Sequence, residues 1–301
     1  MTWIDDSATS AETLLPFLDV MRTLPLRELT IRTHSDLGNI VWTRLIKLTG
    51  LRKISIWCME GPPRVLQGWS DFLGPTLTHL ELGVSTFLYP CSECTCWCFF
   101  PHVLAIDEQR CGGVPSTILI SVLSQLPLLK DLRLKGAPAS AILTILSFLP
   151  NLQSLDTEYL PASGSYQPRY RRLKLPANND SSDDDDPPPP CPVLRHLTVR
   201  ASSMDNLGPH NLWAWIRDIV PLTGLETFRL NSFSINGRTG IPRMFVLDLA
   251  AIHGITLKHF VVVEAQLTLQ DIECLCVKFP MLETLACSTS SPDVVSFVFI
   301  R

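Results

Sequence analysis

Leu129-Lys130-Asp131-Leu132-Arg133-Leu134 is a clear copy of a six-residue motif, L-x-x-L-x-L, that returns along the chain. In the second half of the motif, apolar and polar residues alternate, which is typical of a strand with one buried and one exposed face. Nine copies occur, usually after a Pro or a Gly. They begin at Leu26, Leu51, Leu77, Leu129, Leu152, Leu194, Leu225, Leu257 and Leu282.

The spacing of the copies predicts a repeat architecture. Six of the eight intervals lie between 23 and 32 residues, close to the roughly 20–29 residues of a leucine-rich repeat. Apolar residues with helical periodicity precede most copies. We expect helices over residues 11–21, 40–48, 65–73, 118–126, 141–149, 212–220, 244–252 and 269–279.

A single strand and helix cannot bury the apolar side of such a unit, but stacked copies share a continuous core. The pattern therefore predicts an α/β fold, a curved leucine-rich-repeat solenoid. Its parallel β-sheet would lie on the concave face and its helices on the convex face. We expect residues 1–301 to form a single domain of nine to ten repeats.

The segment from Leu267 to Cys287 resembles the cysteine-containing subtype of leucine-rich repeat. It has an acidic residue, Asp271, ahead of its helix, then Pro280, the motif and a final Cys. This subtype is typical of F-box/leucine-rich-repeat proteins, and the Pro-punctuated form resembles their large fungal families. The resemblance implies a substrate-recognition repeat region of a ubiquitin-ligase adaptor. The 25 residues before Leu26 read as a repeat helix, so we expect binding to a cullin-ligase adaptor only if an F-box lies upstream.

Composition and charge exclude several other classes. With 46% hydrophobic and 18% charged residues, the chain has the composition of a folded protein. Its net charge of −4 argues against a nucleic-acid partner, and no apolar run is long enough for a membrane span. The acidic N-terminus does not resemble a signal peptide. We therefore expect a cytoplasmic or nuclear location and reduced cysteines, with Cys274, Cys276 and Cys287 acting as small buried apolar residues.

An insert accounts for the long gap between the third and fourth copies. Leu77 and Leu129 are 52 residues apart, which equals two periods. One interpretation is a degenerate copy near Val103. The other is a Cys-rich insert over residues 84–109. Its removal restores the period and its ends match splice-site codons, which leads to the hypothesis that it is a translated intron.

The same insert contains a cluster of potential metal ligands, Cys91, Cys94, Cys96 and Cys98. Thiolates bind zinc, but one short run cannot easily surround a tetrahedral ion without ligands from elsewhere. We expect no metal and no cofactor, and treat the run as an incidental loop with unpaired thiols.

A second insert, residues 162–190, separates Leu152 from Leu194. Its acidic and Pro-rich composition cannot bury apolar surface, so we expect a disordered loop. Ser181 and Ser182 each have an Asp three residues downstream, which suits phosphorylation by an acidophilic kinase.

Motifs of catalysis are not found. The chain has no phosphate-binding loop, no dinucleotide-binding Gly motif, no H-E-x-x-H and no G-x-S-x-G, so we expect no enzyme. Trp213 and Trp215 lie two residues apart on an expected helix and cannot share one face. We expect one of them in the core and the other exposed.

The sequence therefore indicates a non-catalytic protein-binding scaffold. An alternative is a leucine-rich-repeat interaction or inhibitor protein unrelated to ubiquitin ligases, or a non-functional fragment of a larger gene. A protein partner would bind the concave face through polar residues between or beside the core positions, where charge is mixed and Arg favours binding hot spots. The candidate residues are Arg133, Arg229, Asp156, Glu81, Asp131 and His196.

Overall fold

The computed structural model describes residues 1–5, 10–33, 37–45, 47–58, 73–84, 116–135, 137–160, 191–201, 209–232 and 240–289. These residues form ten strands and seven helices, and seven of the strands are followed directly by a helix. The chain divides into two compact units, Met1–Ala141 with Asp156–Ser163 and Ile142–Leu155 with Gly164–Arg301. Each unit is described by itself.

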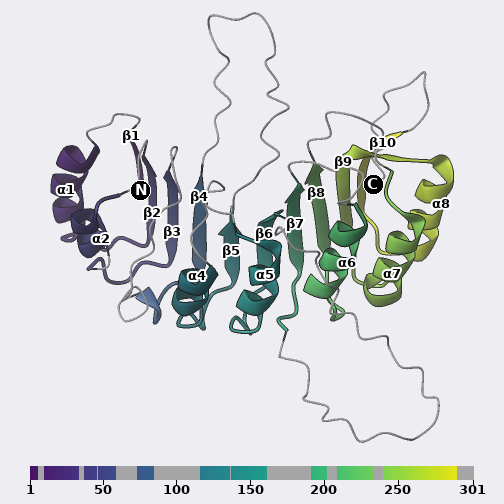
Figure 1. Ribbon diagram of the computed structural model, residues 1–301, viewed down its shortest axis with the longest axis horizontal. Coiled ribbons are helices and arrows are strands. Elements are labelled where there is room, and N and C mark those ends of the chain that lie inside the picture. Colours follow the sequence, from purple (N-terminus) through teal and green to yellow (C-terminus); the bar gives the residue numbers. More distant parts are fainter. Residues whose placement is uncertain are drawn as a thin grey trace, which may run out of the picture. The chain divides into compact units, whose positions relative to one another are not determined.

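The first unit is built on parallel strands that pair in the order of the sequence, β1 with β2, β2 with β3, β3 with β4 and β4 with β5. In Figure 1, α1 and α2 lie beside β1–β3. The elements are β1 Thr2–Asp5, α1 Ser10–Met21, β2 Glu28–Thr33, α2 Asn39–Leu45, β3 Lys53–Cys58, β4 His79–Val84, α4 Ser116–Leu123 and β5 Asp131–Leu134.

The second unit repeats this arrangement. Strands β7 to β10 pair in sequence order and in parallel, with α6, α7 and α8 beside β8–β10 (Figure 1). The elements are β7 His196–Ala201, α6 Pro209–Ile219, β8 Thr227–Ser232, α7 Arg243–His253, β9 His259–Leu267, α8 Leu269–Lys278 and β10 Thr284–Thr289. The intervening α5, Ala139–Leu146, and β6, Ser154–Tyr159, each have residues in both units.

Apolar positions of the motif form the core of both units. Paired strands are aligned copy on copy, so that Leu80 lies opposite Leu132 and Leu197 opposite Phe228. All motif positions are buried except two. These two, Leu26 and Leu282, open the first and last copies and are half-buried. The predicted α/β class and parallel strands are confirmed.

Helices begin and end close to the predicted positions, and local chemistry explains one start in detail. The Thr268 hydroxyl accepts a hydrogen bond from the Asp271 N–H, and the Asp271 carboxylate accepts one from the Thr268 N–H. This reciprocal capping box satisfies amides that the first turn of α8 leaves free. Asp271, expected ahead of the helix, therefore lies within its first turn.

Strand β1 was not predicted. It lies before the first motif copy and pairs with β2, with Trp3 opposite Ile31. Its Trp3 ring packs 4.6 Å from the ring of Phe17 on α1. The strand covers the edge of β2 that would otherwise be open.

Two expectations about buried residues are wrong. Trp213 and Trp215 are both buried, at 4% and 0% exposure, because Phe245 of the neighbouring α7 packs 4.6 Å from the Trp213 ring. Of the three cysteines expected to be buried, Cys287 is buried, Cys274 is half-buried and Cys276 is exposed, since the buried residue of α8 is Leu275. All three thiols are free.

Strand β4 pairs directly with β5. Leu80 and Leu132, which are 52 positions apart in the sequence, are direct partners in the sheet. Val103, the centre of the possible degenerate copy, lies outside the described residues. Val84 ends β4, and residues 85–109 lie outside the described residues, as do Cys91, Cys94, Cys96 and Cys98, the loop 162–190 and the two serines within it.

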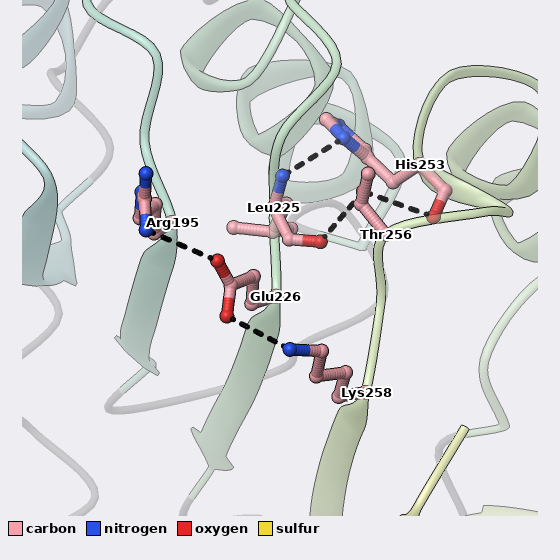
Figure 2. Close-up of polar contacts among 6 residues, drawn as sticks. All are labelled: Arg195, Leu225, Glu226, His253, Thr256 and Lys258. Atoms are coloured by element: carbon pink, nitrogen blue, oxygen red, sulfur yellow. Dashed lines mark hydrogen bonds and ion pairs between the residues drawn. The ribbon is translucent and has the colours of Figure 1, made fainter. Parts of the chain in front are cut away.

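A buried histidine joins neighbouring copies in the second unit. His253, at the end of α7, is fully buried, and its Nδ1 accepts a hydrogen bond from the Leu225 N–H at 3.4 Å (Figure 2). Its Nε2 lies 3.0 Å from the Val220 carbonyl oxygen and donates to it. Only the neutral ring can make both bonds, because a protonated Nδ1 cannot accept a hydrogen bond. Desolvation lowers the pKa of His253, and the bond to Val220 opposes this shift more weakly.

Acid should therefore destabilise the second unit through His253. The unfolded ring takes up a proton at its ordinary pKa near 6.5, whereas the folded ring takes it up at a lower pH. The contribution of His253 is thus complete above about pH 6.5 and is lost as the pH falls toward the folded pKa. We expect His253→Gln to lower the free energy of unfolding by about 1–3 kcal/mol at neutral pH. Denaturant titrations at several pH values test this, and a difference between variant and wild type that does not shrink on acidification would contradict it.

Candidate functional site

Three of the predicted partner-binding residues form a connected polar row across the first unit. An Nη atom of Arg133 on β5 lies 2.6 Å from a carboxylate oxygen of Glu81 on β4. The Nε atom of Arg133 lies 3.0 Å from a carboxylate oxygen of Asp156 on β6. Glu81 also accepts a hydrogen bond from the Ser55 hydroxyl at 2.8 Å. The row follows from the strand register, which places Ser55 opposite Glu81 and Glu81 opposite Arg133.

Trp57 extends this row into a cluster with an aromatic centre. Its indole N–H donates to the Ser55 hydroxyl at 2.9 Å. The Arg133 guanidinium carbon lies 4.9 Å and the Lys135 ammonium nitrogen 5.0 Å from the Trp57 ring, within the range of cation–π attraction. We call Ser55, Trp57, Glu81, Arg133, Lys135 and Asp156 the Trp57 cluster.

A missing side chain explains how Trp57 reaches across a whole strand. Its partner in β4 is Gly83, and a Cβ atom built there would lie 2.4 Å from the Trp57 ring. The indole therefore occupies the space above β4 and reaches the cations of β5. The cluster depends on this Trp–Gly pair.

The electrostatics of the Trp57 cluster are balanced, because two carboxylates offset two cations. The side chains of Arg133, Glu81 and Asp156 are 35%, 20% and 21% exposed, so the partly desolvated ion pairs are held in place and yet accessible. Trp57 is only 8% exposed, so the ring supports the charged side chains from below, and these can exchange hydrogen bonds with a polar group. Within the described ranges, no group of three or more His, Cys, Asp or Glu side chains is placed to hold a metal ion.

The other predicted residues make contacts of their own or belong to the second unit. Asp131, at the start of β5, has a carboxylate oxygen 2.7 Å from Nε2 of His79 on β4, and both side chains are more than 40% exposed. His196 and Arg229 belong to the second unit, where both are exposed on β7 and β8.

Sequence reasoning missed Trp57 and Lys135. The signal was present: Trp57 lies two residues after Ser55 in one strand and therefore on the same face. Aligning the third and second copies also places Gly83 opposite Trp57. Among the residues that the structure describes, no helix has the length and apolar character needed to cross a membrane.

Replacing Gly83 should show how closely the indole is packed. We expect Gly83→Ala to lower the free energy of unfolding by about 1–3 kcal/mol, because the added methyl overlaps the Trp57 ring. Gly240→Ala is the matched control, since its Cβ would meet only an ordinary contact at 3.8 Å. Denaturant unfolding measures both. Equal effects of the two substitutions would show that the indole does not lie over Gly83.

Removing the central cation should cost more than removing an exposed one. Arg133→Ala leaves Glu81 and Asp156 close to each other without the guanidinium between them. We expect a loss of about 1–2 kcal/mol in the free energy of unfolding, against less than about 0.5 kcal/mol for the exposed Arg229→Ala. Thermal and denaturant unfolding of the two variants provide the comparison, and similar losses would contradict the expected difference.

Comparison of the sequence with known protein families and with curated proteins gives no match.

Proposed function

We propose that this chain is a non-catalytic protein-binding scaffold of the leucine-rich-repeat type, a solenoid in which each motif copy supplies one strand. The burial of the motif positions, the parallel strand order and the helices between strands support this proposal. In such a fold one sheet face packs against the helices, and the other is free to bind.

The Trp57 cluster is the observation that carries the proposal. On the face opposite their buried leucines, β5 and β6 carry half-buried polar side chains. There Arg133, which is 35% exposed, lies against the Trp57 ring, which is itself only 8% exposed, and neighbours on four strands hold both. Trp and Arg are the residue types most enriched among binding hot spots, and pre-ordered side chains lose little entropy on binding.

The mixed charge of the face favours a protein partner. Two carboxylates beside Arg133 would repel a phosphate backbone, whereas a protein surface can offer both signs of charge. Following the resemblance to F-box/leucine-rich-repeat proteins, we propose that the bound protein is a substrate presented for ubiquitylation.

A site-specific crosslinker tests which face binds. A photoreactive residue at Lys135 should capture a defined partner in cells, whereas one at Ile40, which is 66% exposed on α2, should not. Lys135→Glu should then weaken binding of the purified partner by about tenfold or more, and Ile40→Glu should leave it unchanged. Capture from position 40 alone would refute the proposed face.

Ubiquitylation needs a separate measurement. If the captured protein is a ligase substrate, its half-life in cells should lengthen when the chain carries Lys135→Glu, and its ubiquitin conjugates should decrease. If a partner binds through the face but its half-life does not change, the result supports the proposed binding function and refutes the proposed role in ubiquitylation.

A further inference from the structure

Charged residues of alternating sign mark the strand starts of the second unit. The residue after the first leucine of each motif copy is Arg195, Glu226, Lys258 and Glu283 in turn. Their backbones form a ladder, since the N–H groups of Glu226, Lys258 and Glu283 donate to the carbonyls of Arg195, Glu226 and Lys258 at 2.7–2.8 Å. Four side chains therefore follow one another along one edge as plus, minus, plus, minus.

The first three of these side chains lie in contact, and all four are accessible to different degrees. Figure 2 shows Arg195, Glu226 and Lys258 side by side at the starts of three strands. Glu226 lies 3.5 Å from Arg195 and 3.4 Å from Lys258. The side chains of Arg195 and Lys258 are 58% and 38% exposed, and Glu283 is exposed as well.

An apolar row runs along the same edge. The segments that lead into β7, β8, β9 and β10 each present one exposed apolar side chain. These are Val193, Leu222, Ile255 and Met281, which are 48%, 44%, 74% and 51% exposed. Parallel strands start at the same edge of a sheet, so the apolar row borders the charged row. Periodic exposed apolar side chains of this kind indicate an interaction surface.

We infer that this edge of the second unit binds the same edge of a second copy of the chain, in an antiparallel arrangement. Reversing the order plus, minus, plus, minus exchanges every sign. A two-fold axis at the middle of the row therefore places Arg195 opposite Glu283 of the second copy and Glu226 opposite Lys258 of the second copy. Every position meets an opposite charge, and the apolar rows cover each other.

Symmetry favours this occupant over others. An aligned parallel arrangement would place like charges opposite each other along the whole row. A parallel arrangement shifted by one strand would restore opposite charges but would not close, and would form chains of molecules. The antiparallel arrangement pairs all four positions and closes as a dimer. It does not depend on what binds the Trp57 cluster.

Charge reversal with complementation tests the arrangement in the full chain. Sedimentation should show a concentration-dependent dimer that weakens as salt is added. Arg195→Glu and Glu283→Arg should each raise the dimer dissociation constant by about tenfold or more, because each creates two like-charge contacts. An equimolar mixture of the two variants should recover dimers. In the mixed dimer the introduced Glu at position 195 meets the introduced Arg at position 283, and the native Glu283 of the first variant meets the native Arg195 of the second.

Matched controls separate the edge from general effects of charge and apolar surface. Glu273→Arg reverses an exposed charge on α8 and should leave dimerisation unchanged. Ile255→Ser should weaken the dimer, whereas Leu269→Ser, which is 78% exposed beyond the opposite end of β9, should not. A monomeric wild type, single variants that dimerise normally, or a mixture that stays monomeric would each overturn the inference.

Discussion

Apolar side chains that one strand and one helix cannot bury are the constraint on which this structure depends. Each copy of the motif completes its core only when the next copy lies beside it. The parallel register follows because the apolar positions of neighbouring strands are buried together only when the copies are aligned. The first and last copies show the same requirement, because each has a motif neighbour on one side alone. Leu26 and Leu282 open the first and last copies, and they are the motif leucines that stay half-buried. Strand β1 covers one side of the first copy with a segment that does not carry the motif.

Much of this architecture could be predicted from periodicity, because burial acts on many leucines at once. The described helices lie close to their predicted ranges, and every described copy of the motif forms a strand. Predictions about single residues were less successful. Trp213 and Trp215 are both buried because a neighbouring helix supplies Phe245, and such a contact is not visible in the local sequence. β1 was missed because four residues without the motif carry too little pattern.

In the candidate site, too, the residues that follow the repeat could be predicted, whereas those that depart from it could not. Glu81, Arg133 and Asp156 could be placed in one row because each occupies the same motif position, and the strand register then brings them together. The aromatic centre could not be found in this way, since Trp57 lies beyond the motif and its position depends on an empty site above Gly83. Periodicity therefore locates the polar row of the sheet, whereas the aromatic ring at its centre depends on a departure from the repeat.

The direct pairing of β4 with β5 has a consequence for how such a chain evolves. The sheet register is decided by leucines on the two strands and not by the number of residues between them. The entropy of closing a connecting segment rises only slowly, by about 0.6 kcal/mol for each doubling of its length. Gain or loss of an exon, or alternative splicing, at this junction would thus change the free energy of folding little. Evolution could therefore replace the connecting sequence while the sheet keeps its register.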